Sequence, residues 1–152
     1  MSGINILYIG GTFDLLHYGH IELFKKCKKL GIVIVSLNND NFVKRYKREP
    51  IIPFKQRKSM LESCRYVDFV IENTNGEDSK PAILKSMATH IVHGNDWTGE
   101  SLMKQMGLTK DWLKKNNIKM IYFPYTKTTS TTNIIRRINK LYGGDSNLSS
   151  QK

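Results

Sequence analysis

Short apolar runs alternate with segments of helical periodicity along most of the chain. The runs have the length of strands, and the apolar positions between them have the spacing of amphipathic helices. The predicted strands cover residues 4–9, 33–37, 67–71, 90–93 and 119–123. The predicted helices cover residues 21–30, 54–65, 80–87, 102–117 and 132–142, and a polar turn is predicted at residues 38–41. This alternation predicts an α/β fold, a single-domain Rossmann-like parallel sheet with helices on both faces.

Length and composition bound the domain organisation. A chain of 152 residues with 39% hydrophobic residues is long enough for one domain with a buried core. We expect that domain to span residues 1–142 and the polar residues 143–152 to form a disordered tail. No apolar run approaches the roughly 18 to 20 residues of a membrane span, and residues 1–5 show no secretory pattern. We therefore expect a cytoplasmic protein with no membrane association.

The net charge of +11, from 24 Lys and Arg against 13 Asp and Glu, raises the question of nucleic-acid binding. The cations are spread over helix faces and one loop, without the interleaved aromatic residues of a single-strand platform. A positive field is also what an enzyme with two phosphorylated substrates needs. We expect small phosphorylated partners and no nucleic acid.

The segment from Tyr8 to His20 carries the clearest chemistry. Gly10 and Gly11 are predicted to release the chain from the first strand, and His17 and His20 fall where strand gives way to helix. Backbone N–H groups at a helix start are unpaired and carry the positive end of the helix dipole, so an anionic phosphate binds well there. The segment therefore predicts a phosphate site with two histidine side chains beside it.

This segment resembles the signature of the cytidylyltransferase-like nucleotidyltransferases, which reads Gly-Thr-Phe-Asp-x-x-His-x-Gly-His. Every defined position is filled, by Gly11, Thr12, Phe13, Asp14, His17, Gly19 and His20. The resemblance implies transfer of CMP from CTP, with His17 and His20 as catalytic residues that hold the triphosphate and stabilise charge at the α-phosphorus. Mg²⁺ is expected to accompany the triphosphate without a protein cage. Asp14 is expected either to hydrogen-bond the turn or to help position that ion.

The basic loop at residues 44–50 follows the second strand, where its cations can reach reacting phosphates. The resemblance implies one catalytic cation here. We assign that role to Lys47 and expect Lys44 and Arg48 to contact substrate phosphate; a solvated charge run is the alternative. Arg65 matches an Arg-Tyr-Val-Asp segment of the glycerol-3-phosphate branch and is expected either to bind phosphate or to pair with Asp68.

Two later segments also follow predicted strands and resemble family motifs. After the fourth strand the motif residues are Gly94, Asp96 and Trp97, expected to read the base, with a packing role as the alternative for Trp97. After the fifth strand they are Tyr125, Thr126, Lys127, Ser130, Thr131 and Thr132. The resemblance implies that the hydroxyls of residues 130–132 cap the last helix and bind the outer phosphates, while Lys127 contacts substrate phosphate. Gly10 completes the expected nucleotide-binding set.

The acceptor is the open question. The segment at residues 125–132 lacks the arginine and glycine that the glycerol-3-phosphate and phosphocholine branches usually carry, and no tryptophan lies between Val70 and Lys80. We expect a small phosphorylated alcohol, with glycerol 3-phosphate as the best candidate. A different phospho-alcohol or a phosphonate, adenylyl transfer from ATP, and a non-catalytic binding protein are the alternatives. A homodimer is expected from the resemblance and from the apolar side chains of Tyr18, Tyr66, Val67 and Phe69.

Overall fold

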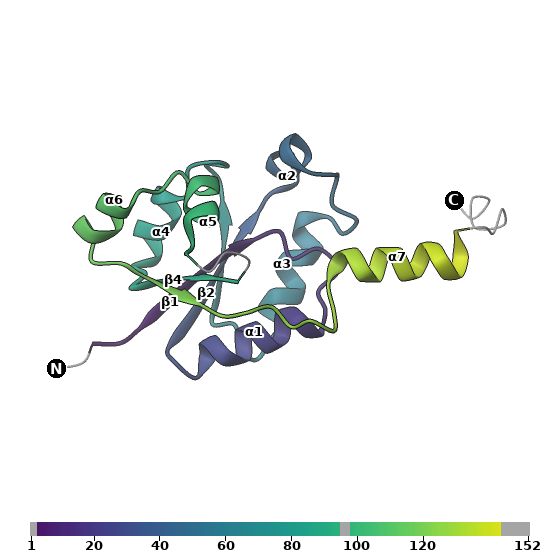
Figure 1. Cartoon of the computed structure of the whole chain (residues 1–152), viewed down its shortest axis with the longest axis horizontal. Coiled ribbons are helices and arrows are strands. Elements are labelled where there is room, and N and C mark those ends of the chain that lie inside the picture. The colour runs from purple at the N-terminus through teal and green to yellow at the C-terminus, as the bar shows by residue number, and fades with distance from the viewer. Residues whose placement is uncertain (1–2, 95–97, 144–152) are drawn as a thin grey trace.

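The computed structural model describes residues 3–94 and 98–143 and has the predicted α/β architecture (Figure 1). The five strands are β1 (Ile6–Gly11), β2 (Ile32–Asn38), β3 (Phe69–Asn73), β4 (His90–His93) and β5 (Lys119–Tyr122). The seven helices of the described residues are α1 (Tyr18–Lys28), α2 (Asp40–Tyr46), α3 (Phe54–Glu62), α4 (Lys80–Ser86), α5 (Glu100–Gln105), α6 (Lys110–Lys115) and α7 (Thr131–Tyr142). The predicted tail lies outside these residues from position 144 onward.

The strands form one parallel sheet in the order β3-β2-β1-β4-β5. β1 is central, with Ile9 opposite Val35 of β2 and Tyr8 opposite Ile91 of β4. The chain first builds outward from β1 to β3 and then returns to β4 on the other side of β1. The carboxyl ends of β1 and β4 therefore flank the switch point at which sheets of this kind bind ligands.

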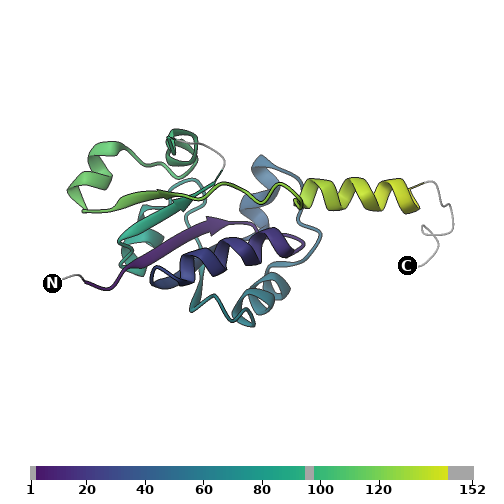
Figure 2. The ribbon, with the colours of Figure 1, turned by 60° about the horizontal axis from the view of Figure 1, so that its bottom comes forward.

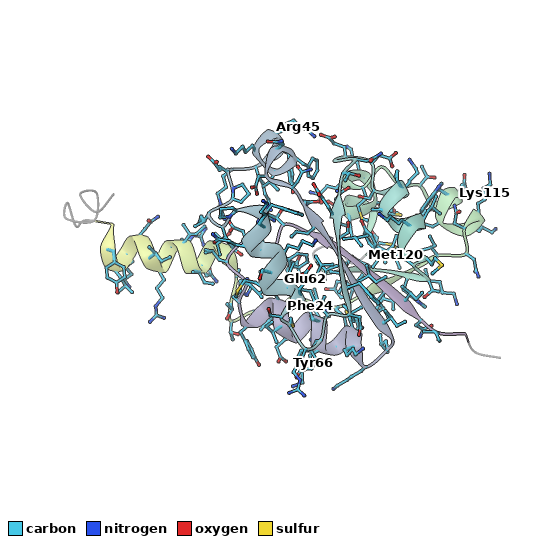
Figure 3. The ribbon with its side chains drawn as sticks, turned by 180° about the vertical axis from the view of Figure 1, so that it is seen from behind. Phe24, Arg45, Glu62, Tyr66, Lys115 and Met120 are labelled. Atoms are coloured by element: carbon cyan, nitrogen blue, oxygen red, sulfur yellow. The ribbon has the colours of Figure 1, made fainter. Side chains whose placement is uncertain are left out.

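Helices cover both faces of the sheet, as predicted. On one face the alternate residues Leu7, Ile9 and Val35 pack with Phe24 of α1 and Leu61 of α3. On the other face the core joins Tyr8 and Ile91 to side chains of α4, α5 and α6, namely Ile83, Met103 and Leu113. Figure 3 shows Phe24 and Glu62 on the side of α1 and α3, and Lys115 and Met120 on the opposite side. Side chains along β1 point alternately to the two faces of the sheet, so this one strand contributes residues to both hydrophobic cores.

Several predicted boundaries were wrong. Asp40 and Asn41 of the predicted turn and the start of the basic loop form α2, because Asn39 caps the Phe42 N–H at 2.9 Å and the helix buries Phe42. The predicted helix at residues 102–117 is two helices, separated at Gly107, whose φ is +69°. The third strand begins at Phe69, two residues later than predicted. Gly10 and Gly11 are the last two residues of β1, whereas a turn after the strand was predicted for them.

The last helix, α7, projects from the body and has no buried residue (Figures 1 and 2). Its apolar side chains, including Ile138 and Leu141, lie on one side and remain about half exposed. Its first residue is tied to the body, because Thr131 Oγ1 donates to the carbonyl of Asp14 at 3.1 Å. Within residues 3–94 and 98–143, no helix has both the length and the apolar character needed to cross a membrane.

Candidate active site

A cleft of about 860 Å³ opens at the carboxyl ends of the strands. The segments that follow β1, β2, β4 and β5 border it, so the topology brings together residues far apart in the chain. Of the predicted residues, it is lined by Gly10, Gly11, Thr12, Phe13, Asp14, His17, Gly19, His20, Lys47, Arg48, Gly94, Tyr125, Thr126, Ser130, Thr131 and Thr132. The volume lies in the range of sites for small organic ligands. The predicted Asp96 and Trp97 lie outside the described residues.

His17 and His20 form a reciprocal cap at the start of α1. His17 Nδ1 accepts the N–H of Gly19 at 3.0 Å, and His20 Nδ1 accepts the N–H of His17 at 3.2 Å. Each Nδ1 is therefore an acceptor, so the proton of each neutral ring lies on Nε2. The two rings stack with centroids 3.8 Å apart. The cap thus leaves two N–H donors, side by side, for a ligand in the cleft.

The electrostatics of the pair keep both rings neutral. Burial lowers the pKa of His17, and burial together with the neighbouring His17 lowers the pKa of His20 to about 4. Neutral rings next to unpaired helix N–H groups form a site that donates hydrogen bonds without already holding a counter-ion. Such a site is suited to an incoming anion.

A second helix start faces the same cleft. Ser130 caps α7 by accepting the N–H of Asn133 at 3.1 Å, as predicted. A Cβ on Gly19 would lie 3.3 Å from the carbonyl oxygen of Thr129, so the segment before α7 passes close to the start of α1. Two helix N-termini therefore converge on one side of the cleft, which is an arrangement for several phosphates rather than one.

Asp14 holds the basic loop. Its Oδ2 accepts the N–H of Ile51 at 2.9 Å and Nη1 of Arg48 at 3.0 Å, and its Oδ1 accepts the N–H of Ile52 at 3.0 Å. Burial alone would raise the pKa of this carboxyl, but the two N–H groups and the guanidinium outweigh burial and lower it. Both oxygens are occupied, so of the two expected roles the geometry is that of a structural one. Nowhere in the described ranges do three His, Cys, Asp or Glu side chains come together as a metal cage.

The loop cations differ in what holds them. Lys44 pairs with Glu49 at 2.7 Å, Arg45 pairs with Glu77 at 3.6 Å, and Arg48 is held by Asp14. Lys47 directly follows α2, lines the cleft and has no ion pair with any described residue. The structure therefore brings Lys47 and Arg48 to the site and leaves Lys44 outside it.

Arg65 and Lys127 do not line the cleft of the single chain. The guanidinium of Arg65 lies 5.8 Å from the ring centre of Tyr66. The alternative partner, Asp68, instead binds Lys28 Nζ at 2.7 Å and accepts the N–H of Val33. The alternative role for Arg65, a pair with Asp68, is therefore absent, while its expected role in binding phosphate stays a prediction.

Sequence reasoning missed the most buried charge of the site. Arg57 is 1% exposed and donates to the carbonyls of Thr12, Asn38 and Ile52 and to the carboxylate of Asp40. It ties the turn after β1 to the end of β2 and to the loop before α3. One signal was available, because Arg57 lies four residues before the buried Leu61 and so shares the inward face of its helix.

A cleft of this kind, at the switch point of a parallel sheet and facing two helix N-termini, is that of a Rossmann-like nucleotidyltransferase fold. A crystal structure of a lipopolysaccharide core biosynthesis protein from Thermoplasma volcanium has the same fold, with a TM-score of 0.65 at 24% identity over 82% of this chain and 100% of that one. The chain belongs to the cytidylyltransferase-like family, whose model matches residues 8–137.

Two relatives are similar to this chain over most of its length. A glycerol-3-phosphate cytidylyltransferase of Staphylococcus aureus is 38% identical over 136 residues, covering 89% of this chain and 93% of that protein. An FAD synthase of Pyrococcus abyssi is 32% identical over 136 residues, covering 88% of this chain and 92% of that protein. Both similarities span nearly the whole of each protein.

Proposed function

We propose that this protein transfers CMP from CTP to a small phosphorylated alcohol, namely glycerol 3-phosphate, with release of pyrophosphate. The observation that carries the proposal is the pair of helix N-termini on one cleft, with the two histidine Nε2–H donors at the first of them. The similarity to the Staphylococcus aureus enzyme supports both the nucleotide and the acceptor.

In the proposed reaction an anionic oxygen of the acceptor phosphate attacks the α-phosphorus of CTP. A new phosphorus–oxygen bond forms, the bond to the oxygen bridging to the β-phosphate breaks, and pyrophosphate leaves with that oxygen. No covalent enzyme intermediate is needed, so the protein's contribution is alignment and charge stabilisation. His17 and His20 donate hydrogen bonds to the phosphates, and the unpaired Lys47 supplies positive charge. At α7 the donors are the Ser130 hydroxyl and the first backbone N–H groups of the helix, because the Thr131 hydroxyl already donates to the carbonyl of Asp14.

Mg²⁺ is proposed to enter with the triphosphate. Because Asp14 is already bonded to three donors, the ion would be held by phosphate oxygens and water rather than by a protein cage. We propose that the reaction takes place in the cytoplasm and involves no nucleic acid.

The acceptor and the base are tested together by pyrophosphate release with CTP and ATP in parallel, across a panel of phospho-alcohols and phosphonates. We expect CTP with glycerol 3-phosphate to give the highest kcat/KM. ATP is the second candidate, because the Pyrococcus abyssi relative is an FAD synthase. Turnover with ATP alone would replace the proposed nucleotide, and no pyrophosphate release with any pair would refute the proposed reaction.

We further propose a homodimer. Tyr18 and Phe69 are 59% and 60% exposed in the single chain, as an interface requires, whereas Val67 is buried within it and is removed from the expected set. Arg65, outside the cleft of its own chain, lies next to Tyr66 in this region. Light scattering at micromolar concentration should give twice the 17.5 kDa chain mass. A monomer that still turns over CTP would refute this assembly.

A further inference from the structure

A chain of side-chain hydrogen bonds runs along the cleft from the end of β3 to the turn after β1. Asn73 Nδ2 bonds to the carbonyl oxygen of Gly76 and to Asn38 Oδ1, each at 3.0 Å. Asn38 Nδ2 then bonds to Tyr46 Oη at 3.2 Å and to Thr12 Oγ1 at 3.4 Å, and these two hydroxyls lie 3.3 Å apart. All five residues border the cleft.

The bond between Asn73 and the carbonyl of Gly76 determines which group donates in each of the other hydrogen bonds. The carbonyl of Gly76 can only accept, so the amide nitrogen of Asn73 must face it. That nitrogen also faces Asn38, so Asn38 presents its oxygen to Asn73 and turns its own nitrogen toward the two hydroxyls. A backbone carbonyl thereby settles the orientation of two amide groups that would otherwise be interchangeable.

At the Tyr46 and Thr12 end of these hydrogen bonds, one hydroxyl hydrogen remains without an acceptor. Asn38 Nδ2 donates to both hydroxyl oxygens, so each of them is an acceptor toward this amide. One hydroxyl of the pair donates to the other, and the remaining hydroxyl hydrogen has no acceptor among the described residues. Tyr46 is 42% exposed, so this hydrogen is accessible from the cleft.

We propose that Tyr46, whose oxygen accepts from Thr12 Oγ1 and Asn38 Nδ2, donates its own hydroxyl hydrogen to the phosphate of the acceptor substrate. The inference rests on the proposed function and adds a binding residue to it. The pair lies at the turn after β1, beside the unpaired cation Lys47, which is where the two reacting phosphates would meet. A hydroxyl that is already bonded on its acceptor side is oriented before the ligand arrives, so little freedom is lost on binding.

The sheet order assigns the phosphate to the acceptor rather than to CTP. Asn38 ends β2, Asn73 ends β3, and Tyr46 ends the helix between them. The chain of hydrogen bonds therefore lies on the β2–β3 side of β1. The motif segment expected to read the base follows β4, on the opposite side of β1. The acceptor therefore occupies the half of the cleft that the hydroxyl pair borders.

The first test compares Tyr46→Phe with the wild type in steady-state transfer from CTP to glycerol 3-phosphate. The substitution removes one oxygen and keeps the ring that packs on Phe42, with centroids 4.5 Å apart. We expect the KM for glycerol 3-phosphate to rise about ten- to a hundredfold, the scale of a hydrogen bond to a charged group, with the KM for CTP within about twofold of wild type. Tyr142→Phe, an exposed tyrosine on α7, is the matched control.

The second test reverses the direction of the hydrogen bonds between residue 38 and the two hydroxyls. Asn38→Asp places a carboxylate oxygen where the amide nitrogen faced the hydroxyls, so both hydroxyls turn their hydrogens inward and none remains for the ligand. We expect a larger rise in the acceptor KM than in Tyr46→Phe. Asn39→Asp adds the same charge one residue away, outside the cleft, and should change that KM by no more than about threefold.

An unchanged acceptor KM in Tyr46→Phe would overturn the proposal, and so would a rise confined to the KM for CTP. If the wild type transfers no nucleotide, the proposed function fails, yet the hydroxyl pair can still be judged by calorimetric titration with glycerol 3-phosphate. Weaker binding by Tyr46→Phe than by Tyr142→Phe would then support a phosphate site at the pair. Equal binding would overturn it.

Discussion

Protonation of His20 should destabilise the folded protein at mildly acidic pH. In the folded chain burial and the stacked His17 lower the pKa of His20 from 6.5 to about 4. Above pH 6.5 the ring is neutral in both the folded and the unfolded state, so it contributes nothing. Between pH 6.5 and 4 the unfolded chain binds a proton that the folded chain does not, so the free energy of unfolding falls as the pH falls.

The magnitude follows from the size of the pKa change. One pH unit is worth about 1.4 kcal/mol, so a pKa of about 4 in place of 6.5 corresponds to roughly 3 kcal/mol lost by pH 4. That loss is a substantial part of the 5 to 15 kcal/mol that typically stabilises a domain of this kind. It is large enough to measure by urea unfolding, followed by circular dichroism, at pH 7 and pH 4.

His20→Asn isolates the effect. The asparagine Oδ1 can accept the N–H of His17 in place of Nδ1, so the helix cap is kept while the titrating ring is removed. His17 and His90, whose pKa values are also lowered by burial, remain in both proteins and largely cancel in the comparison. Between pH 7 and 4 the wild type should lose about 3 kcal/mol more than the variant. Parallel pH dependences in the two proteins would refute the buried, neutral ring.

Three further substitutions follow from the contacts. Lys47→Ala should lower kcat about a hundredfold, the scale of a lost transition-state contact, while Lys44→Ala, paired outside the cleft, should lower it less than threefold; equal effects would mean that another cation acts. Arg57→Met should reduce the free energy of unfolding by about 3 to 5 kcal/mol, because the half-buried carboxylate of Asp40 and three carbonyls lose their buried donor; a change under 1 kcal/mol in urea unfolding would contradict this value. Gly94→Ala should raise the KM for CTP and lower the melting temperature, since a Cβ there lies 2.8 Å from the carbonyl oxygen of Phe123; wild-type values for both would show that the segment relaxes freely.

The sheet could be predicted from sequence because its signal is local. Each strand contains a short apolar run, and in the two central strands, β1 and β2, these runs are largely buried on both faces, at residues 6–9 and 32–35. The edge strands are more exposed, yet their runs at residues 69–71 and 120–122 are still apolar. α2 escaped prediction because its seven residues include four charged or amide side chains, and its stability comes from the Asn39 cap and from burial of Phe42 and Val43. The break at Gly107 depends on a left-handed backbone angle, which apolar spacing does not reveal.

The residues of the site also fall into two groups, those that can be placed from the sequence and those that cannot. Residues within one motif, such as His17 and His20, can be placed from sequence because the strand-to-helix turn holds them together. Arg57 could not be assigned a role, because its partners Thr12 and Asn38 lie 45 and 19 residues away and meet it only in the folded chain. The hydroxyl pair of Thr12 and Tyr46 has the same origin, with 34 residues between its members.

The three hydrogen bonds of Asp14 also bear on how related sequences should be interpreted. An amide at this position would present only one oxygen, and its NH₂ group would face an N–H donor, so asparagine cannot replace the carboxylate without releasing the loop at residues 48–52. Selection to keep the loop closed would then retain the aspartate whether or not the protein still catalysed a reaction. The presence of this aspartate in a homologue is therefore a marker of loop architecture, and catalytic competence has to be judged from the residues proposed to act on the phosphates, His17, His20 and Lys47.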